Sequence, residues 1–141
     1  MKALSLALFL VVILNSSCAK PELSDDKIRE KLVGTWLPDK ELARTLSGEL
    51  TYKKDFTFDG FILVKRPDLT LRWDFAGKWK VKANNLALEY TTSSIPALAP
   101  VGKITSDHIV AVTDTELTFI TEEGKRQVRV RKEENKFLQP R

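Results

Sequence analysis

Hydrophobic and polar residues alternate along most of the chain after residue 34. In residues 69–75, for example, Leu, Leu, Trp and Phe occupy every second position, with Thr, Arg and Asp between them. A period of two is typical of strands that bury one face. Turn-forming residues separate these runs, as at Arg66-Pro67-Asp68 and Asn84-Asn85, and Gly77 permits a bulge. Asp59-Gly60 has the composition of a two-residue hairpin turn.

This rhythm predicts an all-β domain of about eight short strands joined mostly by tight turns. Sequential hairpins form an antiparallel meander, and closing it removes the exposed edges that promote aggregation. We therefore expect a small up-and-down β-barrel, with an open sandwich as the alternative. Residues 91–102 form the longest connection, which either packs over one barrel end or serves as a lid or partner-binding edge. The expected interior includes the aromatic stripe Tyr52, Phe56, Phe58, Trp73, Phe75, Trp79 and Tyr90.

A short helix is expected before the first strand. Ser24 is a good N-cap, and the two aspartates that follow it suit the positive end of a helix dipole. Ile28 and Leu32 share one face, and Gly34 is expected to end the helix. One or two turns should therefore pack their apolar face on the barrel.

The first seventeen residues have the pattern of an export signal. Lys2 precedes the uncharged residues 3–14, a stretch too short for the roughly 20 residues of a membrane-spanning helix. Two cleavages fit: one before Cys18, which would then carry lipid, and one after Ala19. We favour lipidation, because the single cysteine lies where no core exists. The expected organisation is a signal peptide (1–17), a tether (18–27), a barrel domain (28–132) and a flexible tail (133–141).

Charge and candidate chemistry narrow the function. Lys and Arg total 23 against 19 Asp and Glu, and acidic residues interrupt the basic runs, so no nucleic-acid partner is expected. His108 is the single histidine, which gives little support for a zinc site. The sequence has no Gly-x-Ser-x-Gly nucleophile turn and no glycine-rich phosphate loop. We expect a protein that is not an enzyme and uses no metal or cofactor.

Gly34-Thr35-Trp36, placed after a short helix and before a meander, resembles the opening of the lipocalins. The closest resemblance is to the short lipocalin-like domains of bacterial envelope lipoproteins. In that family the tryptophan closes the barrel base under an arginine of the last strand, a place for Arg129 or Arg131 here. Thr113-Asp114 is similar to the family's Thr-Asp-Tyr turn, with Thr115 at the tyrosine position. The resemblance implies structural roles for Gly34, Trp36, Thr113, Asp114, Arg129 and Arg131.

The resemblance also implies a function and a location. A lipoprotein of this kind would be held to a membrane by its N-terminal lipid and would bind a small hydrophobic ligand in the barrel. Ala19 is not the acidic residue that retains many such lipoproteins at the inner membrane, so the outer membrane facing the periplasm is implied. The alternative is a structural or interaction protein with a partner, such as an envelope protein, on the barrel rim. An eight-stranded interior is only just wide enough for its own side chains, which favours a filled barrel.

Overall fold

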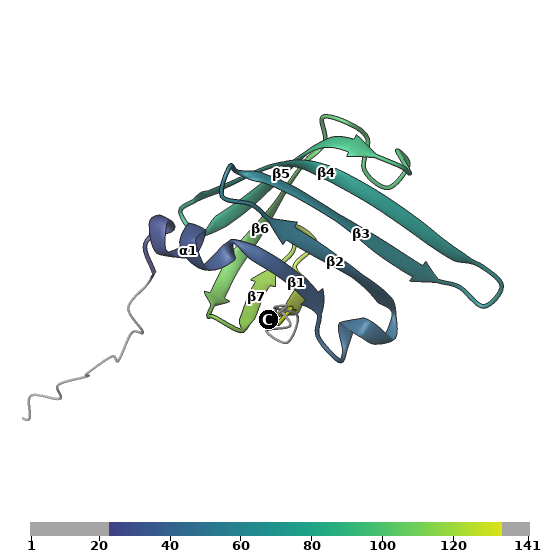
Figure 1. The fold of residues 1–141 in the computed structure, drawn as a ribbon, viewed down its shortest axis with the longest axis horizontal. Helices are drawn as coiled ribbons and strands as arrows, with labels where there is room; N and C mark the ends of the chain where they lie inside the picture. Colours follow the sequence, from purple (N-terminus) through teal and green to yellow (C-terminus); the bar gives the residue numbers. More distant parts are fainter. Residues whose placement is uncertain (1–22, 134–141) are drawn as a thin grey trace, which may run out of the picture.

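The computed structural model describes residues 23–133. Within them, eight antiparallel strands close into a barrel in which each strand pairs with its neighbours in sequence and β1 pairs with β8 (Figure 1). The prediction of an all-β, up-and-down barrel with a short helix is therefore confirmed. The predicted signal peptide, Cys18 and all but the first residue of the predicted tail lie outside the described residues. The elements are α1 (Asp25–Leu32), β1 (Gly34–Pro38), the 3₁₀ turn η1 (Leu42–Arg44), β2 (Leu46–Tyr52), β3 (Thr57–Lys65), β4 (Thr70–Lys82), β5 (Asn85–Ser93), β6 (Ile104–Val112), β7 (Glu116–Ile120) and β8 (Arg126–Arg131).

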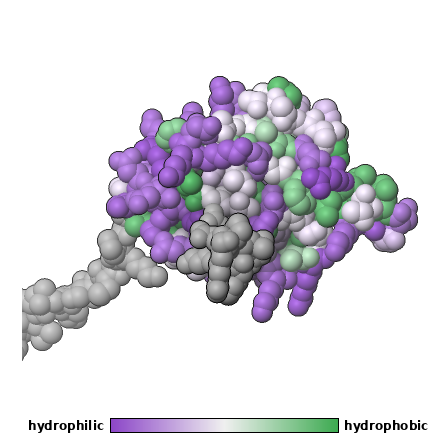
Figure 2. Space-filling model, in the orientation of Figure 1, coloured by the Kyte–Doolittle hydropathy of each residue, from purple (hydrophilic) through white to green (hydrophobic). Residues whose placement is uncertain are grey.

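The alternation of residue types becomes an inner and an outer face. In the second half of β4, buried Phe75, Trp79 and Val81 alternate with exposed lysines. Hydrophilic residues predominate on the outer surface seen in Figure 2, with hydrophobic residues in small groups among them. The predicted bulge at Gly77 is present as a register shift against β5. A Cβ atom at Gly77 would collide with the carbonyl oxygen of Glu89, so the strands approach too closely there for any other residue.

The predicted hairpin at Asp59-Gly60 is wrong, because β3 runs through both residues. The turn lies at residues 53–56, where the Asp55 carboxylate accepts hydrogen bonds from the backbone nitrogen (3.0 Å) and hydroxyl (2.6 Å) of Thr57. Gly60 serves a different purpose: a Cβ atom there would collide with the carbonyl oxygen of Glu49 on β2. Close strand packing, rather than a turn, therefore requires this glycine.

The other expected turns lie between strands. Arg66 and Leu69 close the β3–β4 turn with a backbone hydrogen bond of 2.8 Å. The turn expected at Asn84-Asn85 falls one residue earlier, at Ala83 and Asn84, which have φ angles of 49° and 60°. Two consecutive positive φ angles match the twist of a hairpin whose loop has two residues.

Helix α1 plugs one end of the barrel. The Ser24 hydroxyl caps it, accepting a hydrogen bond of 3.4 Å from the backbone nitrogen of Lys27. The helix begins at Asp25 and so includes residues 25–27 of the predicted tether. Ile28 and Leu32 are buried where the helix packs against β4 and β6. The end that carries α1 is called the base below (Figure 1).

Arg131 and Trp36 form a clasp that joins the two ends of the meander at the base. Trp36 is fully buried, and its indole nitrogen donates to the carbonyl of Leu32 at 2.8 Å. The guanidinium carbon of Arg131 lies 4.3 Å from the centre of the indole ring. The same guanidinium donates to the carbonyls of Val33 at 2.7 Å, of Asp114 at 2.6 Å, and of Lys31. The Arg131 side chain therefore links β8, which carries it, to α1, to β1 and to the turn between β6 and β7.

The short motifs around the clasp have structural explanations. A Cβ atom at Gly34 would collide with Nη1 of Arg131, so the glycine leaves the space that the arginine fills. The Thr113 hydroxyl accepts hydrogen bonds from the backbone nitrogens of Thr115 at 3.3 Å and Glu116 at 3.0 Å. The Asp114 carboxylate accepts a hydrogen bond of 2.7 Å from the ammonium group of Lys31 on α1.

Replacing Arg131 by alanine should destabilise the barrel by about 2–4 kcal/mol. The substitution leaves up to three backbone carbonyls without their donor and uncovers the indole of Trp36. Urea unfolding followed by tryptophan fluorescence measures the change. The matched control is Arg126→Ala on the same strand, whose exposed side chain should contribute within about 0.5 kcal/mol. Equal stability of the two variants would contradict the clasp.

Candidate functional site

The barrel interior is packed at the base and hollow toward the opposite end. Leu32, Trp36, Val81, Leu86 and Leu117 fill the base, each at most 2% exposed. Beyond them, inward side chains from every strand between β2 and β8 surround a cavity of about 400 Å³. Sites for small molecules have volumes of roughly 300–1,000 Å³. The expectation of a filled barrel is therefore correct for the base and wrong for the open end.

Three aromatic rings in mutual contact form one wall of the cavity. The Trp73 ring lies 4.5 Å from that of Phe75, its neighbour on the same face of β4, and 5.8 Å from that of Tyr90 on β5, centre to centre. The Trp73 and Tyr90 rings are inclined by 27° and are stacked. The Trp73 indole nitrogen donates to the hydroxyl of Ser93 at 2.9 Å, which fixes the ring in place. This wall offers an apolar aromatic surface of the kind that binding pockets use.

The predicted aromatic stripe divides into three groups. Tyr52, Trp73, Phe75 and Tyr90 line the cavity. Phe58 and Trp79 are buried, at 1% and 3% exposure, in the core cluster. Phe56 is 51% exposed in the β2–β3 turn, so its assignment to the interior is wrong. The alternation that predicted it stops where the strand ends, and the Phe56 ring lies 5.2 Å from the buried Trp79 ring, centre to centre.

A guanidinium group faces the aromatic wall. Arg129 pairs across the strands with Leu117, whose side chain is buried inside, and residues directly opposite in an antiparallel pair share a face. Strand β8 lies halfway around the closed barrel from β4, which places Arg129 across the cavity from Trp73 and Phe75. Its guanidinium carbon lies 5.9 Å from the centre of the Phe119 ring. Of the two arginines expected over Trp36, Arg131 holds that place and Arg129 belongs to the cavity.

A carboxylate on β6 completes the polar side of the cavity. Asp107 pairs with buried Leu86 and points inward by the same rule. Burial, and to a smaller extent the carboxylate of Glu122, raise the pKa of Asp107 to about 6 against the opposing effect of Arg129. At neutral pH the cavity therefore holds a carboxylate and a guanidinium together.

The phenols of Tyr52 and Tyr90 are uncharged at neutral pH, whereas the exposed side chains of Lys103, Glu122, Glu123 and Lys125 add charges to the lining. Burial raises the pKa of Tyr52 well above its usual value, and Arg129 only partly offsets this. Burial likewise raises the pKa of Tyr90, while a hydrogen bond with Thr105 lowers it. Both phenols therefore remain neutral and can donate hydrogen bonds. Gln127 adds a neutral amide to the same lining.

Sequence reasoning did not identify the polar cavity residues. Strands β6 and β8 carry polar side chains at positions that face inward: Thr105 and Asp107 on β6, and Gln127 and Arg129 on β8. That register was readable from the apolar neighbours Ile109 and Leu117, which mark the inner face. Polar residues at such positions are a signal of function, because buried polar groups are costly unless they have partners.

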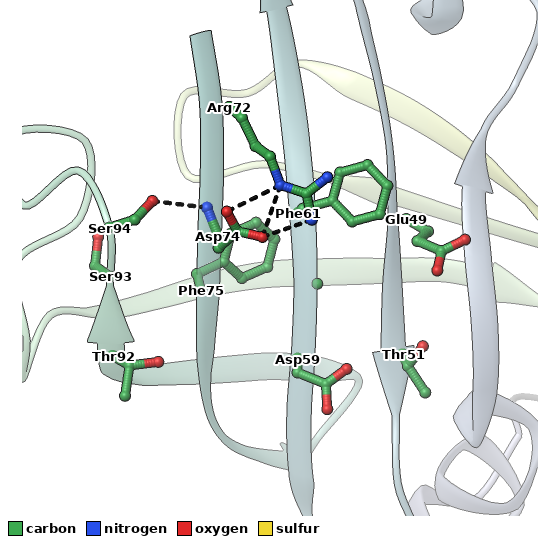
Figure 3. Close-up of a pocket in the computed structure, with 11 residues that line it drawn as sticks. Glu49, Thr51, Asp59, Phe61, Arg72, Asp74, Phe75, Thr92, Ser93 and Ser94 are labelled. Atoms are coloured by element: carbon green, nitrogen blue, oxygen red, sulfur yellow. Dashed lines mark hydrogen bonds and ion pairs between the residues drawn. The ribbon is translucent and has the colours of Figure 1, made fainter.

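A second hollow, of about 600 Å³, lies on the outer face of strands β2–β5 (Figure 3). Figure 3 shows the guanidinium of Arg72 beside the carboxylate of Asp74, with donor–acceptor distances of 2.8–3.0 Å. The guanidinium carbon also lies 4.1 Å from the centre of the Phe61 ring. Glu49 accepts from Lys132 at 2.6 Å, and Asp59 pairs with Lys53. The charged groups of this outer hollow already have partners, so the inner cavity is the stronger candidate for a ligand-binding site.

Metal chemistry receives no positive indication from the described part of the chain. His108 is exposed on β6, and its Nδ1 lies 3.3 Å from the side-chain oxygen of Asn85. No group of three or more His, Cys, Asp and Glu side chains in residues 23–133 is placed to hold a metal ion.

No family model matches the sequence, and no curated protein matches it significantly. Across residues 23–133, no helix combines the length and apolar character needed to cross a membrane. The geometry of the cavity is therefore the basis for the functional argument.

The raised pKa of Asp107 predicts a pH-dependent stability difference between the protein and its Asp107→Asn variant. The folded state keeps the proton up to a pH of about 6, whereas an unfolded aspartate loses it near about 3.9. The folded state thus binds more protons in this window, and its stability falls as pH rises through it. Asparagine does not titrate, so the variant should gain about 1–2 kcal/mol relative to the parent between pH 4 and pH 7.5, allowing for screening by water.

Urea unfolding of both proteins at these two pH values measures the difference. A difference in stability that is the same at pH 4 and pH 7.5 would show that the Asp107 carboxyl titrates as it does in the unfolded chain. The charged groups that act on Asp107 are Glu122 and Arg129, and the neutral phenols of Tyr52 and Tyr90 lie in the same cavity.

Proposed function

We propose that this protein is an exported lipoprotein whose lipocalin-like barrel binds a small, largely hydrophobic ligand without transforming it. The observation that carries the proposal is the cavity of about 400 Å³ with its aromatic wall. A water molecule occupies roughly 30 Å³ of liquid, so the space suits a ligand on the order of ten to twenty non-hydrogen atoms. Apolar burial on Trp73, Phe75 and Tyr90 would supply most of the binding free energy.

The direction of the chain agrees with a lipid anchor at Cys18. The described chain begins beside α1, at the packed base, while the cavity lies toward the other end of the barrel. A lipid on Cys18 would therefore attach the protein through its base and leave the cavity free. Several acyl chains give stable anchoring, because each buried methylene contributes about 0.8 kcal/mol.

Exposed apolar residues at one edge of the barrel favour a second candidate function, the docking of an envelope protein. Leu98 and Val101, in the connection between β5 and β6, are 45% and 67% exposed, and Ile104 at the start of β6 is 59% exposed. Ala99 of the same connection is buried at 2% exposure, so part of this loop packs down while its apolar neighbours face outward. In this alternative the cavity would be incidental.

Filling the cavity should abolish ligand uptake. Gln127 lines the cavity and makes no side-chain hydrogen bond to the described residues, so Gln127→Trp adds bulk there without removing an interaction. We expect saturable binding of a hydrophobic fluorescent dye to the parent protein and at least ten-fold weaker binding to the variant. The matched control is Ser106→Trp, on the outer face of β6, which should bind as the parent does.

Equal uptake by parent and Gln127→Trp would place the dye outside the cavity and contradict the proposal. Absence of uptake by all three proteins would favour the docking alternative. Urea unfolding of the three proteins establishes that the variants are folded.

The anchor predicts a specific behaviour of the Cys18→Ser variant. When the full chain is expressed in a bacterium, the parent should partition with membranes and incorporate labelled fatty acid, because Cys18 carries the acyl chains. The variant should lose both properties. A parent protein found soluble in the periplasm with Lys20 at its N-terminus would show cleavage after Ala19 instead.

A further inference from the structure

Two half-buried residues of opposite charge in the cavity, Asp107 and Arg129, form no ion pair with each other, whereas the other charged residues of its lining are exposed (Lys103, Glu122, Glu123 and Lys125). Within residues 23–133, neither the Asp107 carboxylate nor the Arg129 guanidinium has a hydrogen-bond or ion-pair partner. Both are half-buried and belong to the lining of the same cavity. Charges in a barrel interior are normally paired, because removing them from water is costly. The free faces of both groups are therefore directed to whatever fills the cavity.

These two charges restrict the head group of a ligand. A pure hydrocarbon would displace water from both groups and offer neither a partner. An anionic head attracted to Arg129 would be repelled by Asp107, and a cationic head attracted to Asp107 would be repelled by Arg129. A neutral head with an acceptor and a donor side by side satisfies both charges at once, and each hydrogen bond to a charged group is among the stronger kind.

We propose that the cavity binds an amphipathic carboxamide, whose carbonyl oxygen accepts from Arg129 and whose N–H donates to Asp107 while its alkyl or aryl part lies on the aromatic wall. The inference rests on the proposed binding function and specifies its ligand class. The phenol of Tyr52 and the amide of Gln127 lie in the same lining and supply further neutral hydrogen-bonding groups beside the head.

A series of ten-carbon probes with one head group each tests the inference. Decanamide has both the acceptor and the donor, N,N-dimethyldecanamide has the acceptor alone, and decanoate and decylamine carry one charge each. Calorimetric titration of the protein at pH 8 should give a Kd for decanamide at least ten-fold lower than for each of the other three probes. Equal affinities for all four would leave ligand binding intact and overturn the head-group inference.

Two variants test the roles of the two charges separately. In Asp107→Asn, decanoate binding should strengthen at least ten-fold, because the repelling carboxylate is gone. In Arg129→Gln, decylamine binding should strengthen by a similar factor. The control is Glu89→Gln, an exposed carboxylate on the outer face of β5 that does not line the cavity, which should keep the parent preference for decanamide.

Unchanged preferences in both variants would overturn the inference. No binding of any probe to the parent would overturn the proposed function and the inference with it. Urea unfolding of each variant, with a cooperative transition like that of the parent, shows that the comparison is made between folded proteins.

Discussion

The barrel depends on the clasp between Arg131 and Trp36. The two side chains come from the last strand and the first, which meet only when the meander closes. Trp36 fills the base, and Arg131 satisfies carbonyls at the end of α1 and in the turn before β7. Gly34 is required because its missing side chain leaves room for the guanidinium. The contact of one cation with one indole thus joins the closing strand pair, the helix plug and the packed base.

Strand β8, which closes the base through Arg131, also contributes Arg129 to the cavity. Arg129 precedes Arg131 by two residues and shares its face, so the two lie roughly 6–7 Å apart along β8. Arg131 has three carbonyl partners and a ring, whereas Arg129 has only the distant face of Phe119 among the described residues. The guanidinium of Arg131 therefore has a structural role at the base, whereas the guanidinium of Arg129 remains available to a ligand in the cavity. Asp107, raised in pKa by burial, is the complementary charge.

Much of the architecture followed from local pattern, and the failures came from long-range geometry. Alternation predicted the strands, and Ser24 and Gly77 took the local roles expected of them. The turn prediction at Asp59-Gly60 was wrong because turn propensity is a local property, whereas Gly60 is required by the close approach of strand β2. Phe56 misled because the alternation was continued through a turn. Asp107 was not identified, and Arg129 was expected over Trp36 rather than in the cavity, because the inward direction of both side chains follows from their cross-strand partners, Leu86 and Leu117.

The central claim is that the barrel is sealed at the base by the clasp and open to ligand at the other end. The chain has three tryptophans, and their indole N–H groups give separate signals in a ¹H–¹⁵N NMR spectrum of the protein. Titration with a small hydrophobic amide should shift the Trp73 signal saturably and leave the Trp36 signal in place, because Trp73 lines the cavity and Trp36 is buried under Arg131. A Trp73 signal that stays fixed while the Trp36 signal moves would contradict the account.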